Sequence, residues 1–325
     1  MTRWPPFVFA VLIAITTAVP SLAQAPAWPA RPLKLVIPFP SAGATDTLGR
    51  TLAQKLGDAL GQPVVVDNKP GAGGAIGSDI VAKAPADGYT MLMATTSTHS
   101  IGPGLNPKLP YNAEKDFIPV VWVANSTNIL IAAPTLPVSN VAELVAFARA
   151  HPGQVNFASS GTGTIVHLTG ELFASMAGVT ITHVPYKGTA LAIPDLMSGQ
   201  VSIMFDNIVS ALPYVKSGKV KALGISGAKR SPLVPDVPTI AQSGVPGFIS
   251  DTYFGVFVPA GTPREVVNRL NTEINRIVAS PEFRDKLASL GAEPVGGSPE
   301  QFAAEIRNES AKWAKVIKDA GVKLE

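Results

Sequence analysis

The amino-acid sequence predicts an α/β protein built from two lobes. Apolar runs with the spacing of strands alternate along the chain with runs that have the spacing of helices, a pattern typical of parallel sheets covered by helices. This alternation occurs in two successive series, after which the last quarter of the chain returns with one more strand and two helices. A chain of 325 residues is also long enough for two domains of roughly 150 residues each.

The composition favours a folded protein and excludes several classes of function. Charged residues make up 15% of the chain and hydrophobic residues 46%, which excludes a disordered protein. A formal net charge of +3 gives no concentrated basic face for a nucleic acid. The chain has no cysteine, so disulfides, thiolate catalysis, cysteine zinc sites and a lipoprotein anchor are excluded together. We expect no nucleic-acid partner, no metal and no cofactor.

Residues 1–23 have the layout of a secretory signal peptide. Arg3 provides the positive start, residues 7–19 (FVFAVLIAITTAV) form an apolar segment, and small residues at Ser21 and Ala23 mark a cleavage site. The alternative is a membrane anchor, but the apolar segment is shorter than the roughly 20 residues that a spanning helix needs. The sequence therefore predicts export to the periplasm with cleavage after Ala23.

The first series contains three strands and two helices. Strands are predicted at residues 33–37, 63–67 and 89–94, where short apolar runs end at proline, glycine or polar residues. Leucines recur every four residues over 48–60, which is the spacing of an amphipathic helix. A second helix is predicted to begin at Ile76.

The second series and the return segment follow the same alternation. Strands are predicted at 128–133, 155–158, 181–184, 201–205 and 220–225, with helices at 141–148, 165–176 and 190–198 between them, then an irregular proline-containing segment at 232–238, a strand at 253–258 and helices at 266–277 and 302–316. Because the C-terminus completes the first lobe, we expect residues 24–124 plus 250–325 to form lobe 1. Residues 125–249 then form lobe 2.

Two loops of small residues are candidate anion-binding sites. Residues 38–46 connect the first strand to the leucine-rich helix, and residues 159–164 precede a helix that carries His167. Unpaired backbone N–H groups at a helix N-terminus carry partial positive charge and suit a carboxylate or phosphate. The alternative for the first loop is an ordinary connection capped by Thr45 or Asp46. If the two helix ends face each other across a cleft, a dicarboxylate would fit between them.

The other motifs in the sequence give weaker indications of a function. Residues 71–77 resemble a dinucleotide-binding loop, but Ile76 stands where the motif needs glycine, so we expect a tight turn and close helix packing. No GxSxG motif is present, which argues against a hydrolase of that type. Asp206 ends a predicted strand, where ligands bind in open α/β sheets, or alternatively caps the next helix. His167 either faces a ligand or has a structural role at the start of its helix.

Several of these segments together resemble the substrate-binding proteins of tripartite tricarboxylate transporters, the Bug family. The resemblance rests on residues 38–46, 67–74, 86–90, 116–117, 152–153, 156–161, 183–188, 205–207 and 259–263. It implies a type II periplasmic binding-protein fold, with two α/β lobes joined by two crossing segments and a ligand cleft between them. It also implies a monomer that captures a small carboxylate (a di- or tricarboxylate, an acidic amino acid or an aromatic acid). The ligand would pass to the integral-membrane permease subunits of such a transporter.

The resemblance also implies a set of ligand-binding residues. These are Phe39, Ser41, Ala42, Gly43, Thr45, Asp46, Thr98 and His99 in lobe 1, and Ser159, Gly161, Gly163, Thr164, His167 and Asp206 in lobe 2. The family binds carboxylates through backbone amides and ordered water more than through an arginine clamp. Ala42 departs from the family pattern, because glycine is common there, and its methyl group narrows the allowed backbone conformations.

Two alternatives to delivery of a ligand remain open from the sequence. A sensing subunit could bind the same ligand and report to a membrane receptor, and the soluble lobes would have the same sequence features. A periplasmic enzyme that acts on carboxylates is disfavoured, because the chain lacks a nucleophile elbow, a metal-ligand set and a nucleophile–base spacing. We therefore expect a binding protein with no catalytic residues.

Overall fold

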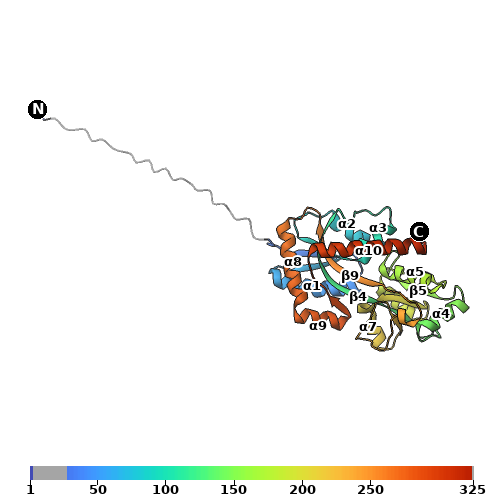
Figure 1. The fold of residues 1–325 in the computed structure, drawn as a ribbon. Helices are drawn as coiled ribbons and strands as arrows, with labels where there is room; N and C mark the ends of the chain where they lie inside the picture. Colours follow the sequence, from blue (N-terminus) through green and yellow to red (C-terminus); the bar gives the residue numbers. More distant parts are fainter. Residues whose placement is uncertain (3–27, 324–325) are drawn as a thin grey trace.

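The computed structural model describes residues 1–2 and 28–323. Residues 28–323 fold into two lobes around a continuous curled sheet (Figure 1). Apart from residues 1–2, the predicted signal peptide and its cleavage site lie outside the described residues. Among the helices that are described, none combines the length and the apolar character that a membrane crossing requires.

Lobe 1 is built on five main strands in the order β2-β1-β3-β9-β4. Strands β1 (Leu33–Ile37), β2 (Val64–Asn68) and β3 (Thr90–Thr95) are parallel, whereas β9 (Asp251–Pro259) runs antiparallel to β3 and to β4 (Phe117–Ala132). A short strand, β10 (Ala292–Pro294), pairs with β4.

The helices of lobe 1 cover both faces of its sheet. They are α1 (Ala44–Leu60), α2 (Ala75–Ala82), α3 (Gly102–Leu105), α8 (Arg264–Ala279), α9 (Pro281–Leu290) and α10 (Pro299–Ala320), with short turns η1 (Ala72–Gly74) and η2 (Ser97–Ile101). Leucines 48, 52, 56 and 60 of α1 are all buried, in one cluster with β1 and α8. The four-residue spacing therefore predicted this helix and its buried face correctly.

Lobe 2 continues the sheet in the order β4-β7-β5-β6, with β8 also paired to β4. Its strands are β5 (Asn156–Ser159), β6 (Thr182–Pro185), β7 (Ile203–Asn207) and β8 (Lys221–Ile225), and its helices are α4 (Val141–Ala150), α5 (Ile165–Ala177), α6 (Thr189–Ser198), α7 (Ile208–Lys216) and the short turn η3 (Ala241–Ser243). Because β5 is parallel to β6 and β7, their carboxyl ends meet at one edge of the sheet, which faces lobe 1.

The two lobes are joined by two adjacent crossing segments. Strand β4 pairs with β9 as far as Thr127 and with β7 from Asn128 onward, so it belongs to both sheets. The second crossing runs through Ser250 into β9. Asn128 Nδ2 donates to the carbonyl of Ser250 (2.9 Å), and Thr252 Oγ1 donates to Asn128 Oδ1 (3.3 Å), so the crossings are tied to each other.

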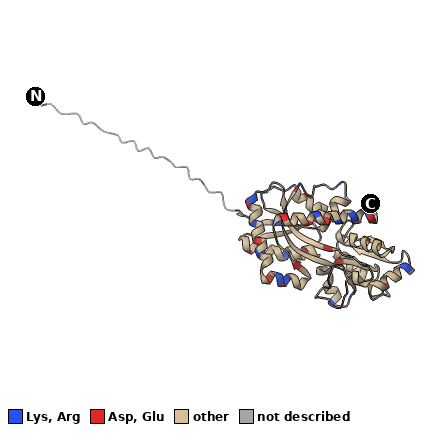
Figure 2. Ribbon diagram, in the orientation of Figure 1, with Lys and Arg blue, Asp and Glu red and all other residues tan. Residues whose placement is uncertain are grey.

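Helix α10 spans both lobes (Figure 1). Near its start, Phe302 packs on Tyr253 and Phe257 of lobe 1, with ring centroids 5.5 and 5.1 Å away. Near its end, the fully buried Trp313 belongs to the hydrophobic cluster of lobe 2, which includes Phe173. Figure 2, which colours the ribbon by residue type, shows both basic and acidic residues along this helix and on the outer helices of lobe 1.

Several elements differ from the sequence-based prediction. Strand β4 begins at Phe117 and not near residue 128, because Pro119 sits beside a register shift that hides the strand pattern. Helices α7 and α9 and strand β10 were missed, so the last quarter has three helices instead of two. No element was predicted for Ser97–Ile101, which form the π-helical turn η2.

Candidate ligand-binding site

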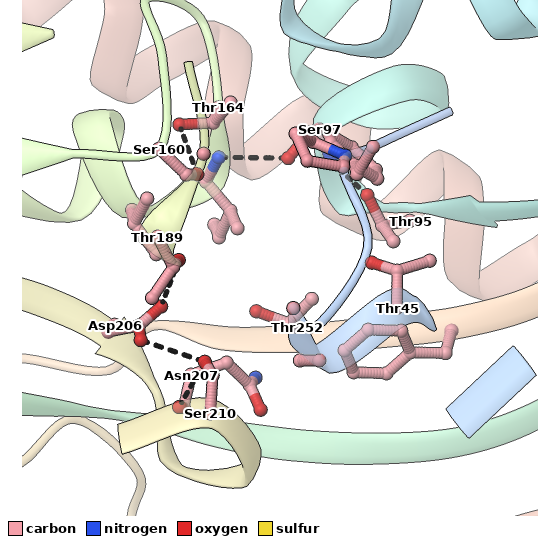
Figure 3. A pocket seen from close by; sticks show the side chains of 18 of the residues that line it. Thr45, Thr95, Ser97, Ser160, Thr164, Thr189, Asp206, Asn207, Ser210 and Thr252 are labelled. Atoms are coloured by element: carbon pink, nitrogen blue, oxygen red, sulfur yellow. Dashed lines mark hydrogen bonds between the residues drawn. The ribbon is translucent and has the colours of Figure 1, made fainter. Parts of the chain in front are cut away.

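A cavity of about 70 Å³ lies between the lobes, well above the roughly 15 Å³ that one water molecule needs (Figure 3). Lobe 1 lines it with Phe39, Pro40, Ser41, Gly43, Ala44, Thr45, Thr95, Ser97, Thr252 and Phe254, and lobe 2 with Ser160, Thr164, Ile165, Val166, Gly188, Thr189, Asp206, Asn207 and Ser210. Since both lobes contribute, the complete set of walls exists only when the lobes lie together.

Three helices begin at this cavity without a side-chain cap. The N-cap residues of α1, α5 and α6 are Gly43, Thr164 and Gly188, and none of their side chains accepts a hydrogen bond from the helix. The N-cap side chains therefore do not occupy the first N–H groups of these helices. One of these groups, the N–H of Ile165 in α5, donates instead to Ser97 Oγ. The helix ends also place partial positive charge at the cavity. An arrangement of this kind binds anions, most simply carboxylate or phosphate groups.

The local sequence explains why these ends are open. Gly43 and Gly188 have no side chain with which to cap. Thr164 has a hydroxyl, but its Oγ1 donates to the carbonyl of Gly161 at 2.7 Å and is turned away from its helix. By contrast α7, the fourth helix at the cavity, is capped by Asn207, whose Oδ1 accepts from the N–H of Val209 at 3.1 Å.

Cationic side chains are absent from the cavity lining, in which Asp206 is the single ionisable residue. The other walls combine hydroxyl groups with the apolar side chains of Phe39, Ile165 and Phe254. Charge recognition at this site therefore falls to backbone N–H groups and hydroxyls, and apolar side chains set the shape of what fits between them.

Asp206 ends β7 and faces the cavity. Its Oδ1 accepts from Thr189 Oγ1 (3.0 Å) and its Oδ2 from Ser210 Oγ (2.7 Å), so the carboxyl group joins the starts of α6 and α7 (Figure 3). Burial raises the pKa of Asp206 to about 6, although the two hydroxyl groups oppose that shift. An ionised Asp206 would repel a bound anion, and a protonated one would not. The next helix is capped by Asn207 and not by Asp206.

Asp46 does not line the cavity but is hydrogen-bonded to the first loop at Ala42. Its carboxylate accepts from the N–H of Ala42 (3.0 Å), from Arg50 Nε (3.0 Å) and from Asn68 Nδ2 (3.0 Å). Burial by itself would raise the pKa of Asp46, but the hydrogen bonds that it accepts, first of all from Arg50, outweigh burial and hold the pKa below its usual value. Ala42 adopts the left-handed φ of 65°, which costs an alanine roughly 1–2 kcal/mol.

The lobes contact each other across the cavity. The N–H of Ile165, at the start of α5, donates to Ser97 Oγ of lobe 1 at 2.9 Å (Figure 3). Gly188 approaches Pro40 of lobe 1 so closely that a Cβ on the glycine would lie 2.8 Å from Pro40 Cγ. These contacts describe a closed arrangement of the two lobes.

The cavity brings together six of the predicted site residues, namely Phe39, Ser41, Gly43, Thr45, Thr164 and Asp206. It is not lined by Ala42, Asp46, Thr98, His99, Ser159, Gly161, Gly163 or His167. In the helical turn η2, Ser97 faces the cavity while His99 is buried against Phe257, with ring centroids 4.2 Å apart. Burial there lowers the pKa of His99 to about 3.

Some lining residues have a sequence signal although they were not among the predicted site residues. Gly188 and Thr189 start α6 with the same small-residue pattern as the two loops chosen as anion sites. Ser210 lies one helical turn after Asp206, a spacing that places it beside the carboxyl group. Thr252 and Phe254 lie on β9, and no motif marks them, because only the antiparallel return of that strand brings them to the cavity.

Comparison with known proteins identifies the family. The model of the tripartite tricarboxylate transporter family receptor matches residues 48–322. The chain belongs to this family. BugT of Bordetella pertussis is 39% identical to this receptor over 98% of its chain and 97% of BugT.

Solved structures of similar proteins agree. Rpa4515 of R. palustris, solved with adipate, is 40% identical with a TM-score of 0.89, over 91% of this receptor and 99% of that chain. MatC of Rhodopseudomonas palustris, solved with bound malate, is 35% identical with a TM-score of 0.85, over 89% and 100% of the two chains. The family is one of transport receptors and not of enzymes. The similarity to the solved structures of periplasmic binding proteins confirms the expected type II periplasmic binding-protein fold.

Proposed function

We propose that this receptor captures a small dicarboxylate in the periplasm and delivers it to the membrane subunits of a tripartite tricarboxylate transporter. The observation that carries the proposal is the meeting of three uncapped helix N-termini, from both lobes, at one cavity whose lining has no cationic side chain. Donors of this kind bind a carboxylate without an ion pair.

The division of the donors between the lobes provides the mechanism. One carboxylate binds at the start of α1 in lobe 1, and the other at the starts of α5 and α6 in lobe 2. Because only the closed arrangement brings both sets onto one ligand, a dicarboxylate stabilises the closed state over the open one. The membrane subunits would recognise the outer surface of the closed receptor.

Two relatives support the dicarboxylate class. Adipate, seen with Rpa4515, and malate, seen with MatC, both carry two carboxylates joined by a short chain. Apolar side chains such as Phe39 and Phe254 would contact that chain here and select its length.

The proposal includes the organisation and location of the mature protein. Residues 24–124 with 250–325 act as one rigid lobe and 125–249 as the other, hinged where β4 and the Ser250 segment cross. The receptor works as a monomer after export and cleavage behind Ala23. Intact-mass measurement of protein purified from the periplasm tests the cleavage, since the expected mass is that of a chain starting at Gln24.

Thermal unfolding of the exported receptor with a ligand panel tests the function. The panel contains malate, succinate, adipate, glutamate, citrate, nicotinate and phthalate, with a sugar as a negative control. Hexanoate is a matched control for adipate, because it has the same carbon chain and one carboxylate. A ligand at 100 times its Kd stabilises by about 2.7 kcal/mol, a shift of roughly 4 °C for a chain of about 300 residues that unfolds as one unit. An equal shift with hexanoate and adipate, or none with any carboxylate, would contradict the proposal.

A further inference from the structure

Two histidines lie stacked directly behind the second-lobe loop, which consists of residues 159–164. His167 of α5 and His183 of β6 have ring centroids 3.9 Å apart with planes inclined by 23°. Phe157 of β5 packs against both rings, with its centroid 4.9 Å from that of His183 and 6.3 Å from that of His167. Neither histidine lines the ligand cavity, so the proposed recognition of carboxylates does not use them.

The hydrogen bonds of His167 define which nitrogen carries its proton. The N–H of Gly163 donates to His167 Nδ1 at 3.2 Å, which requires a lone pair on Nδ1. The proton of the neutral ring is therefore on Nε2, which faces Glu171 Oε1 at 3.5 Å. His167 is thus a neutral acceptor for the loop.

The neighbouring groups hold both rings in place. Burial, and then the proximity of His167, lower the pKa of His183 to about 3, so this ring stays neutral. Glu171 on α5 faces the pair, while β5 contributes the uncharged Phe157 and Ser159, whose Oγ lies 2.6 Å from His183 Nε2. The loop is therefore tied to the pair at two points, at Gly163 through His167 and at Ser159 through His183.

The loop needs this support because its backbone is unusual. Gly161 and Gly163 have φ angles of 139° and 79°, and the loop carries Ser160 and Thr164 into the cavity wall. It also touches lobe 1, since a Cβ on Gly73 would lie 3.1 Å from the carbonyl oxygen of Thr162. Loss of the Gly163 bond therefore disturbs both the cavity and the contact between the lobes.

We propose that His167 is a positioning residue for the ligand: its Nδ1 accepts from the N–H of Gly163 and thereby holds the second-lobe loop in the shape that the cavity wall requires. This inference rests on the proposed carboxylate-binding function, which gives the loop its role. Loss of the acceptor at Nδ1 should therefore weaken ligand binding although His167 does not line the cavity.

Side-chain nitrogen NMR of the exported receptor without ligand tests the protonation state directly. The chain has four histidines, and the signals of His167 are assigned by their loss in His167→Asn. At pH 8 we expect a proton on Nε2 and none on Nδ1. A proton on Nδ1 at pH 8 would overturn the proposal, whatever the protein binds.

Adipate affinity at pH 8 tests the consequence for binding. His167→Phe keeps a ring but no acceptor, and losing one hydrogen bond corresponds to about a tenfold loss of affinity relative to wild type. His167→Asn restores an acceptor at the position of Nδ1, because Asn Oδ1 is bonded to Cγ as His Nδ1 is, and it should recover most of that affinity.

Two controls isolate the effect. His151→Gln removes a histidine at the end of α4, away from the cavity, and should follow wild type. Asp206, whose pKa is raised to about 6, is present in every variant, so it does not account for a difference between them at pH 8. Equal affinity of His167→Phe and wild type, or no recovery in His167→Asn, overturns the proposal. Absence of adipate binding in the wild type contradicts the proposed function instead, and the NMR result then decides on His167.

Discussion

Asp206 is 2% exposed, and its side-chain partners are the hydroxyl groups of Thr189 and Ser210. Neutral donors compensate a buried carboxylate less well than a cation does, which is why its pKa is raised to about 6. Asp46 shows the opposite case, because Arg50 accompanies it and its pKa is lowered. Asp206 and Asp46 therefore differ in charge behaviour, because Asp206 is buried among neutral donors whereas Asp46 accepts from Arg50.

The raised pKa of Asp206 predicts a pH dependence of stability. The folded group titrates near pH 6 and the unfolded group near 3.8, so the folded state holds the extra proton between these values. The free energy of unfolding should therefore fall as pH rises from about 4 to 6 and level off above, by about 3 kcal/mol for this group. Urea unfolding of wild type and Asp206→Asn at pH 4.5 and 7.5 measures it. The variant should lose less stability on going to pH 7.5, and equal losses would contradict the assignment.

Among the elements, those whose pattern is local could be predicted from the sequence. Helix α1 follows from leucines at a four-residue spacing, and the open starts of α1 and α5 follow from small-residue loops after a strand. Helix α7 contains Pro213, which interrupts its pattern, and only Phe283 and Leu287 of α9 are buried. The cavity residues on β9 depend on strand pairing between distant segments, which periodicity does not encode.

The start of α6 lies close to Pro40 of lobe 1, and this contact provides a test of how the lobes close. Gly188→Ala places a methyl group 2.8 Å from Pro40 Cγ and should keep the lobes from closing fully. We expect at least a tenfold loss of affinity for adipate, measured by calorimetry. Gly244→Ala is the matched control, because Gly244 has a φ of 107°, close to the 120° of Gly188, but no atom lies within 4 Å of the added Cβ. Equal affinities of the two variants would show that the contact with Pro40 does not limit binding.

At the scale of the molecule, the lobes share more than their two crossing segments. Ile101 and Leu105, which follow β3 of lobe 1, belong to the same hydrophobic cluster as Trp313 of α10 and Phe173 of lobe 2. Strand β4 runs through both sheets without a break. The stability of each lobe therefore depends on the other.

This coupling predicts a single cooperative unfolding transition. Scanning calorimetry of the receptor should give one peak, with equal calorimetric and van't Hoff enthalpies. Trp313→Ala removes a fully buried side chain that joins α10 to lobe 2, and should cost about 3–5 kcal/mol and broaden or split the peak. Two resolved transitions in the wild type would contradict shared stability of the lobes.

The use of peptide N–H groups at the starts of α1, α5 and α6 has a consequence for how such a receptor changes over generations. Point mutation replaces side chains and leaves the peptide groups in place, so no single codon encodes the recognition of negative charge. Side chains such as Phe39, Ile165 and Phe254 can be exchanged while the charge-binding groups persist. A duplicated gene can therefore drift toward a different acid through intermediates that still bind one.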